Sequence, residues 1–195
     1  MRRQRAFTLI ELMVVVALVA IVLMIAAPSF RDFILLQRLK SINAQLVTDL
    51  QFARSEAVAR NTLMRVQFRA NDSVTCYSLF TAPAAPDNKI VCDCLLGAGG
   101  GSCDAGATEV RTVLVPRGLS VRVLTPPYEL GSFAYDPVTG GIKSIPFDSP
   151  SVPINRFVVD TSIDAARNLR VVVNRAGRPS VCKPTGSTMS AEACP

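Results

Sequence analysis

The amino-acid sequence predicts an α+β protein in which a long amino-terminal helix packs on a mostly antiparallel β-sheet domain. Three observations support this fold class. Residues 7–27 form a nearly uninterrupted apolar run, residues 28–61 continue with apolar residues spaced three or four apart, and beyond residue 61 that spacing falls to two. The helix is therefore expected to have a membrane half and an amphipathic half.

The apolar segment follows a basic start and contains a single charge. Arg2, Arg3 and Arg5 precede it, and Glu11 is the one ionisable residue among the 21 residues from 7 to 27. As a helix, a segment of this length rises roughly 30 Å, the thickness of a bilayer core. The arginines predict a cytoplasmic start, with the chain beyond Pro28 outside.

Secretory signal peptides and plain membrane anchors are alternative interpretations of this segment. A signal peptide has an apolar core of about 7–15 residues and a small-residue cleavage site. The run here is longer, and a cut after Ala27 would place Pro28 next. The Arg2-Arg3 pair is a weak signal for twin-arginine export. A plain anchor fits the length but leaves Glu11 unexplained, because a carboxylate inside a membrane helix costs about 2.5–3.5 kcal/mol.

Glu11 needs a cationic partner, and the segment itself contains none. Cleavage between Ala6 and Phe7 would create a free amino terminus four residues before Glu11. The stretch RAFTLIEL, followed by an apolar helix ending at Pro28, resembles the class III leader of type IV pilins and type II secretion pseudopilins. The resemblance implies that a prepilin peptidase cuts between Ala6 and Phe7 and methylates Phe7, and that Glu11 is the assembly carboxylate. The family usually has glycine before the cut, and we expect the small Ala6 to be processed too.

The expected organisation has four parts: a leader (1–6), a transmembrane and assembly helix (7–27), an amphipathic helix (28–61) and a periplasmic β-rich pilin domain (62–195). Pro28 cannot donate a backbone hydrogen bond, so a kink or break is expected there. The amphipathic part carries one apolar stripe: Leu35, Leu39, Ile42, Leu46, Leu50, Ala53 and Ala57. Residues 46–62 (LVTDLQFARSEAVARNT) resemble the minor-pilin group of FimT, FimU and GspH, which implies a pilin-like fold.

Strands are expected throughout the carboxy-terminal domain. Met64, Val66 and Phe68 alternate with polar residues, which is typical of a strand. Further strands are predicted at 74–80, 110–115, 119–124, 132–135, 156–159 and 169–173, and a last one after the turn at Ala176-Gly177. Residues 133–141 (FAYDPVTGG) resemble a hairpin of the same family.

Six cysteines follow the apolar segment: Cys76, Cys92, Cys94, Cys103, Cys182 and Cys194. An even number in an exported domain favours disulfides, with 15 possible pairings, over a metal site. The resemblance to pilins implies a small loop closed by Cys182 and Cys194. Near residues 82–107 we expect a disulfide-pinned surface loop; its GAGGGS stretch lacks the Lys-Ser/Thr of a phosphate-binding loop.

Composition argues against an enzyme and predicts no cofactor and no metal. The chain has no histidine, which removes the commonest general base and the usual zinc ligand. Three of its 21 basic residues lie in the leader, so the processed chain has 18 basic against 15 acidic side chains, a net charge of +3. Overall charge is therefore weak support for a nucleic-acid partner.

The expected function is a non-catalytic minor pilin or pseudopilin. After processing, it waits in the bacterial inner membrane as a single-pass protein with a periplasmic domain. It then joins other subunits, through the amino-terminal helix, in a type IV pilus or a type II secretion pseudopilus; the sequence does not separate these machines.

The alternative is a DNA-binding minor pilin for natural transformation. DNA uptake in the FimT-like branch is associated with a Gly-Arg-x-Arg motif. Gly177-Arg178-Pro179-Ser180 lacks the second arginine, and Arg175 is the candidate replacement.

Overall fold

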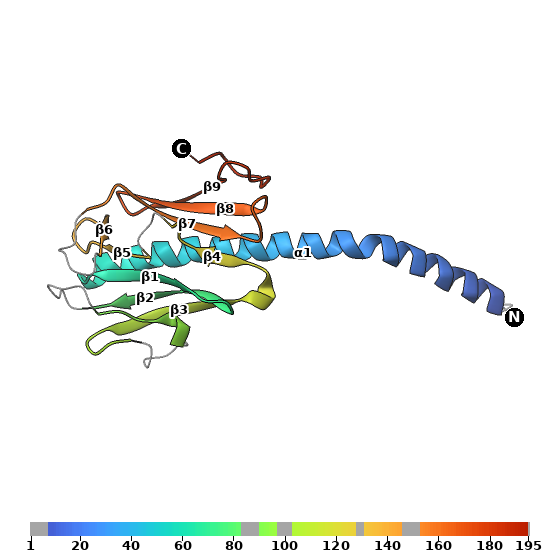
Figure 1. Ribbon diagram of the computed structural model, residues 1–195, viewed down its shortest axis with the longest axis horizontal. Coiled ribbons are helices and arrows are strands. Elements are labelled where there is room, and N and C mark those ends of the chain that lie inside the picture. Colours follow the sequence, from blue (N-terminus) through green and yellow to red (C-terminus); the bar gives the residue numbers. More distant parts are fainter. Residues whose placement is uncertain (1–7, 83–89, 97–102, 128–130, 146–152, 195) are drawn as a thin grey trace, which may run out of the picture. The chain divides into compact units, whose positions relative to one another are not determined.

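The computed structural model describes residues 8–82, 90–96, 103–127, 131–145 and 153–194, and the side chains of 25–28 are not described. The chain divides into two compact units, Met1–Gln37 and Arg38–Pro195. Helix α1 (Leu9–Arg60) runs through the first unit and into the second, and the strands β1 to β9 belong to the second (Figure 1).

Within the second unit, α1 buries the carboxy-terminal part of the predicted apolar stripe. Leu39, Leu46 and Leu50 are fully buried, as are Ala53 and Ala57. Each buried leucine contributes about 1.5–3 kcal/mol of transfer free energy. The helix ends at Arg60, and Asn61 adopts a left-handed conformation (φ 49°), which a short polar side chain tolerates better than most.

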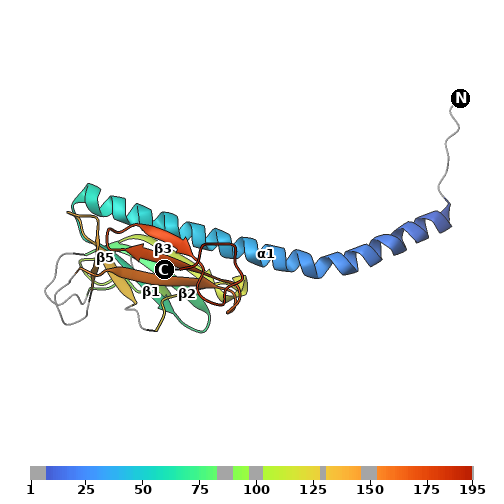
Figure 2. The ribbon, with the colours of Figure 1, turned by 90° about the horizontal axis from the view of Figure 1, so that it is seen from above.

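Two antiparallel sheets pack against this part of α1, and Figures 1 and 2 show both beside it. The first sheet has the order β3-β2-β1-β5-β6, formed by β1 (Met64–Ala70), β2 (Val74–Thr81), β3 (Thr108–Pro116), β5 (Ser132–Tyr135) and β6 (Ile142–Ser144). The second has the order β4-β7-β8-β9, formed by β4 (Arg122–Leu124), β7 (Arg156–Ser162), β8 (Asn168–Asn174) and β9 (Pro179–Cys182). The predicted α+β, pilin-like fold is thus confirmed.

Aromatic rings join the two sheets. Phe157 of β7 lies 5.8 Å from Phe68 of β1 and 4.5 Å from Phe133 of β5, measured between ring centroids. Phe68 also contacts Tyr77 of β2 at 5.8 Å. Such pairs contribute about 0.5–1.5 kcal/mol beyond the area that they bury, so the core ties both sheets together.

A buried polar contact fixes α1 to the first sheet. Asp49 is 1% exposed, accepts a hydrogen bond from the Tyr77 hydroxyl at 2.7 Å, and pairs with Arg111 of β3 at 2.8 Å. Burial, followed by the hydrogen bond to Asp49, raises the pKa of Tyr77, so the hydroxyl remains a donor. The contact is therefore a polar anchor within the buried face of the amphipathic helix, and the buried Asn43 adds a second one by donating to the Thr161 hydroxyl of β7 at 3.2 Å.

The sheets differ from the sequence-based expectation at β4 and in β1, besides the short strand β6, which was not predicted as a separate element. The strand expected at 119–124 begins only at Arg122, because the 3-10 turn η3 (Arg117–Leu119) precedes it and Ser120 is left-handed (φ 58°). Arg65 and Gln67, two of the three polar positions of β1, are 1% and 6% exposed rather than facing water, whereas the third, Arg69, is exposed.

A disulfide-bonded segment explains the burial of these polar residues. Cys94, in the 3-10 turn η1 (Cys94–Leu96), bonds to Cys76 of β2, and Cys92 bonds to Cys103. The segment accepts hydrogen bonds at its carbonyls, from Arg65 to Ile90 at 3.0 Å and from Ser78 to Cys92 at 2.9 Å. The remainder of the loop expected near 82–107, including GAGGGS, lies largely outside the described residues.

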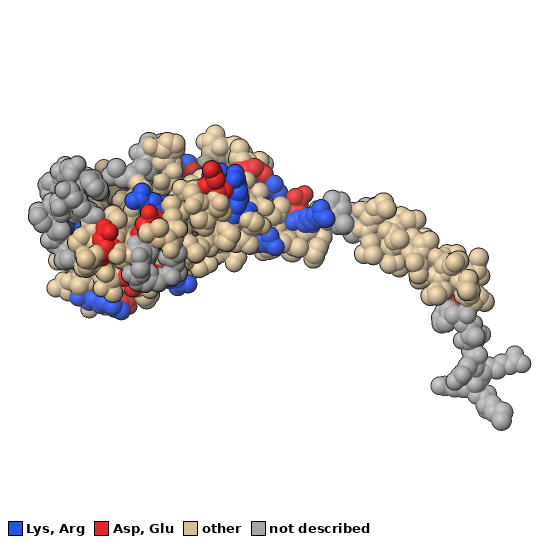
Figure 3. All heavy atoms as spheres, turned by 60° about the horizontal axis from the view of Figure 1, so that its bottom comes forward, with Lys and Arg blue, Asp and Glu red and all other residues tan. Residues whose placement is uncertain are grey.

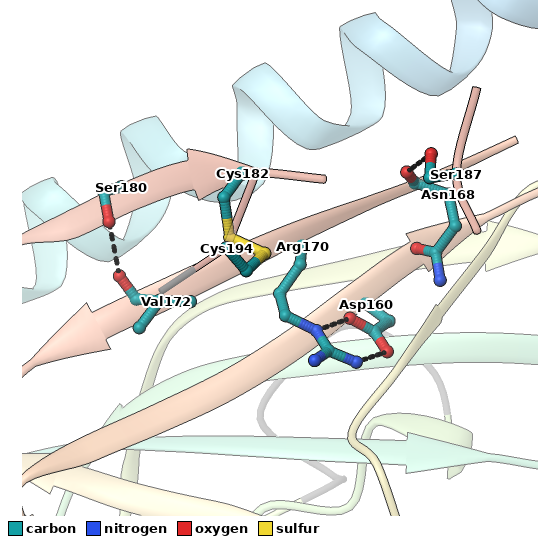
Figure 4. Close-up of a disulfide and its surroundings, with 8 residues drawn as sticks. All are labelled: Asp160, Asn168, Arg170, Val172, Ser180, Cys182, Ser187 and Cys194. Atoms are coloured by element: carbon teal, nitrogen blue, oxygen red, sulfur yellow. Dashed lines mark hydrogen bonds and ion pairs between the residues drawn. A yellow bond between two sulfur atoms is a disulfide. The ribbon is translucent and has the colours of Figure 1, made fainter. Parts of the chain in front are cut away.

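The third disulfide joins Cys182 of β9 to Cys194, the pair that the resemblance to pilins implied (Figure 4). Backbone hydrogen bonds from Lys183 to Glu192 (2.7 Å) and from Cys194 to Lys183 (3.0 Å) close the loop between them.

Among the described residues, no group of three His, Cys, Asp or Glu side chains is placed to hold a metal ion.

Candidate functional site

The start of α1 is capped by a residue next to the predicted cleavage site. The Thr8 hydroxyl accepts a hydrogen bond from the Glu11 backbone N–H at 3.3 Å. Thr-x-x-Glu is the pattern of a capping box, and a carboxylate in the first turn is stabilised by the positive end of the helix dipole. Glu11 is exposed there, and Ala6 and Phe7 lie outside the described residues. The carboxylate is thus available to a group from another chain.

The first half of α1 is apolar and has no cover within its own unit. Large apolar side chains from Leu9 to Met24 are 51–79% exposed. Figure 3 shows this stretch in tan, apart from a small red area near its start. Soluble monomers rarely expose apolar surface of this extent, so lipid or other helices must cover it.

Within the described residues, no helix taken alone meets the length and composition expected of a membrane span, but the segments Leu9–Met24 and Ser29–Arg60 meet them together as a bent pair. Pro28 falls within the bounds of α1, between these two segments. The expected helix break there stays a prediction.

A second cluster connects α1 to two turns of the sheets. Arg54 donates through Nε to the carbonyls of Gly140 and Ala176, at 3.0 and 3.1 Å. Gly177 is left-handed (φ 76°), and a Cβ added to it would lie 2.0 Å from the Gly140 oxygen. The β5–β6 and β8–β9 turns are therefore in close contact, and one helix side chain holds both.

The residues proposed for DNA binding lie in the second of these turns. Arg175 and Arg178 are exposed, whereas Gly177 between them is buried. Arg156 is paired in register with Asn174, so it lies at the same end of the second sheet. Two further arginines are engaged by carboxylates: Arg167 pairs with Asp164 and Arg170 with Asp160. Arg167 and Arg170 are therefore engaged within the domain, and Arg175 and Arg178 stay the candidates for phosphate contacts.

Two families match the chain. The family described as Type II transport protein GspH matches residues 43–177, which is more than half of the chain. The chain belongs to the GspH family. The Prokaryotic N-terminal methylation motif matches residues 1–27, around the predicted cleavage site. No curated protein and no solved structure matches the chain.

Membership of the GspH family confirms the recognition made from the leader and the helix end. GspH pseudopilins are structural, non-catalytic subunits of the type II secretion pseudopilus, processed at their methylation motif. Membership also implies that a peptidase processes the chain and that it assembles with other pseudopilins. The motif and the apolar helix together indicate a pilin-like protein of the inner membrane.

Sequence reasoning assigned no role to Arg54 or Asp136, and it identified Gly177 as a turn residue without predicting the contact between the two turns. Arg54, Asp136 and Gly177 all fall inside the part of the chain that matches the GspH family. The glycines at 140, 141 and 177 signalled turns, but nothing in the sequence showed that these turns touch. Arg54 lies off the apolar stripe, where a charged side chain usually faces water.

Asp136 holds the β5–β6 turn of this GspH-family chain, and we expect its contribution to depend on pH. Its carboxylate accepts hydrogen bonds from the Thr139 and Val138 N–H groups at 2.8 and 3.0 Å and pairs with Lys143. Burial raises the pKa of Asp136, but the bonds from Lys143 and Thr139 outweigh burial and lower it from 3.8 to about 2.

Because the pKa of Asp136 is lower in the folded state than in the unfolded state, its charged carboxylate stabilises the folded protein above pH 3.8. This contribution is lost as the pH falls towards 2 and the carboxylate is protonated. Asp136→Asn should therefore cost about 2 kcal/mol at pH 7, and the difference from the wild type should shrink below about pH 4. Urea unfolding at pH 7, 4 and 2 measures this. A difference that is constant across the three pH values would rule out the charged role of Asp136.

DNA binding stays a hypothesis for this GspH-family chain, and a mobility shift tests it. If Arg175 and Arg178 contact phosphates, replacing both with alanine should weaken DNA binding. The slope of log binding constant against log salt concentration should also become shallower, by about one unit for each lost contact. Arg117, which donates to the Asp72 carbonyl at 2.7 Å on another part of the chain, serves as the control for loss of charge. An unchanged shift in the double variant would remove the hypothesis.

Proposed function

We propose that this chain is cut between Ala6 and Phe7, methylated at Phe7, and incorporated into the pseudopilus through its apolar helix, with Glu11 as the assembly carboxylate. The observation that carries the proposal is the uncovered apolar helix, with Glu11 exposed at its capped start. The match of residues 1–27 to the methylation motif supports the position of the cut.

Glu11 is tolerated because a neighbouring subunit brings a positive charge to it. A carboxylate at the depth of the bilayer core costs about 2.5–3.5 kcal/mol when it has no partner. The amino group of Phe7, freed by the cut, carries a positive charge and belongs to the same end of the helix. When two processed helices pack side by side, the amine of one subunit neutralises Glu11 of the other, and apolar packing supplies the remaining free energy.

Before assembly, the chain is a single-pass protein of the inner membrane with its carboxy-terminal domain in the periplasm. The basic leader favours a cytoplasmic start. The three disulfides of the carboxy-terminal domain are stable in an oxidising compartment such as the periplasm. Both observations support the same orientation.

The amino terminus of the membrane-extracted protein tests the processing step. We expect its mass spectrum to show a chain that begins at a methylated Phe7. Ala6→Leu is the matched control: a bulky side chain before the cut should leave the leader attached. Recovery of wild-type protein that still begins at Met1, or that begins beyond Pro28, would overturn the proposal.

A further inference from the structure

A polar pocket lies in the second unit where the β5–β6 and β8–β9 turns meet. It has a volume of about 320 Å³. Its lining combines three charged residues with three apolar ones: Asp136, Lys143, Arg175, Ile142, Pro153 and Ala176. Because ligand pockets start at about 300 Å³, the space can take the end of an acidic side chain or of a peptide.

The described lining of this pocket carries a net charge of +1. The carboxylate of Asp136 is charged at neutral pH, since its pKa is about 2, and it pairs with Lys143. Within the part of the chain that the structure describes, the guanidinium of Arg175 has no hydrogen bond or ion pair. An arginine presents two parallel N–H donors that match the two oxygens of a carboxylate. The remaining charge therefore suits a single carboxylate group.

Contacts within the domain fix the walls of the pocket. The Arg175 carbonyl accepts a hydrogen bond from the Ile142 N–H at 3.2 Å, which ties the β8–β9 turn to β6. The carbonyls of Gly140 and Ala176, one from each turn, both accept from Arg54 of α1. A site whose walls are already in place loses less conformational entropy when a ligand enters it.

The rim of the pocket favours a protein partner over DNA. Val138 precedes the lining residue Thr139 and is 82% exposed, so an apolar contact is available beside the charged group. Binding to a duplex depends on several phosphate contacts, whereas Asp136 offsets Lys143 and leaves one positive charge here. GspH-family chains assemble with other pseudopilins, so such subunits are the proteins that this surface meets.

We propose that this pocket binds a carboxylate of a different pseudopilin, either an acidic side chain or the carboxyl terminus of that subunit. Arg175 binds the two carboxylate oxygens, and the apolar wall formed by Ile142 and Pro153 contacts the carbon atoms that carry them. Val138 packs on the surrounding surface of the partner. The inference rests on the proposed function, because the two subunits meet only during assembly.

Photo-crosslinking of the full chain, in cells that carry its secretion machinery, tests the contact. Benzoylphenylalanine replaces Val138 in one variant and, as a control for helix packing, Val16 in another. We expect position 138 to crosslink to a different pseudopilin, next to an acidic residue or at the carboxyl terminus.

Three results at position 138 would overturn the inference while position 16 still crosslinks to a neighbouring helix. They are a nuclease-sensitive adduct alone, an adduct to a second copy of this chain alone, and no adduct. Absence of protein adducts from both positions would overturn the assembly mechanism and the inference with it.

The charge of Arg175 provides a second test. In the position-138 variant, Arg175→Ala should lower the crosslink yield about tenfold or more, corresponding to a loss of about 1.4 kcal/mol. Arg178→Ala removes a positive charge from the same turn, outside the pocket lining, and should retain the yield. DNA contacts would instead make the two variants equally defective. An equal loss in both, or an unchanged yield in Arg175→Ala, would contradict the carboxylate site.

A charge exchange identifies which carboxylate the pocket holds. Arg175→Glu should abolish the crosslink, and a lysine in place of the crosslinked acidic residue of the partner should restore it. A contact made by the carboxyl terminus is not restored in this way and is lost when the last residues of the partner are deleted. A yield that neither change in the partner affects would overturn the inference.

Discussion

Replacing Glu11 by alanine is expected to leave the carboxy-terminal domain folded and to reduce incorporation into the pseudopilus by at least about 100-fold. Removing one member of a desolvated charge pair costs about 3–5 kcal/mol, because the partner charge is left unpaired. Each 1.4 kcal/mol corresponds to about a factor of ten in an equilibrium constant. The ratio of variant in sheared pseudopili to variant in membranes, read by immunoblot, measures the effect.

Two further variants separate the charge of Glu11 from its place in the helix cap. Glu11→Gln keeps the length of the side chain and its fit to a capping box, but loses the charge, so it should fail as the alanine variant does. Thr8→Ala removes the hydroxyl that accepts the Glu11 N–H, costs about 1 kcal/mol of helix stability, and keeps the carboxylate. Normal incorporation of Glu11→Ala, or an equally severe defect in Thr8→Ala, would contradict the assembly role.

Gly177→Ala is expected to destabilise the carboxy-terminal domain by about 2–5 kcal/mol. A left-handed alanine costs about 1–2 kcal/mol, and forcing atoms into a packed site costs about 1–3 kcal/mol more. The added methyl group would lie 2.0 Å from the Gly140 oxygen, a backbone atom that cannot move without opening the turn held by Arg54. Urea unfolding of the detergent-solubilised chain, followed by far-ultraviolet circular dichroism, measures the loss.

Gly186 provides the matched control for Gly177. It is also left-handed (φ 87°), but a Cβ there would have nothing within 4 Å. Gly186→Ala should therefore show the cost of backbone conformation alone, about 1–2 kcal/mol. Equal losses in the two variants would mean that the contact between the turns does not constrain the domain.

The sequence was most informative where one periodicity governs a long segment. The helical stripe through Leu39, Leu46 and Leu50 is buried as predicted, because one face of a helix must meet the core. The short strand Ser132–Tyr135 was also placed correctly, because turn residues follow it in the sequence. The short strand β6 (Ile142–Ser144) was not predicted as a separate element, since three residues are too few to show an alternation.

Contacts between distant segments could not be predicted from the sequence. Arg65 looked like a solvent-facing strand residue, and only the disulfide-bonded segment that includes Ile90 explains its burial. Arg54 and Gly177 are 123 positions apart, and no local pattern shows that one helix side chain meets that turn. By contrast, Glu11 was identified because a carboxylate is energetically unfavourable in an apolar membrane helix, and such a residue usually has a function.

A zero-length crosslink tests the central claim most directly, because it forms only when the Glu11 carboxylate touches an amine. Assembled pseudopili from a mixture of isotope-labelled and unlabelled chains would be treated with a hydrophobic carbodiimide and examined by mass spectrometry. We expect an amide between the Phe7 amine of one chain and the Glu11 carboxylate of another, with mixed isotope composition. Glu11 that carries only reagent adducts, or amides confined to single chains, would contradict the pairing of neighbouring subunits.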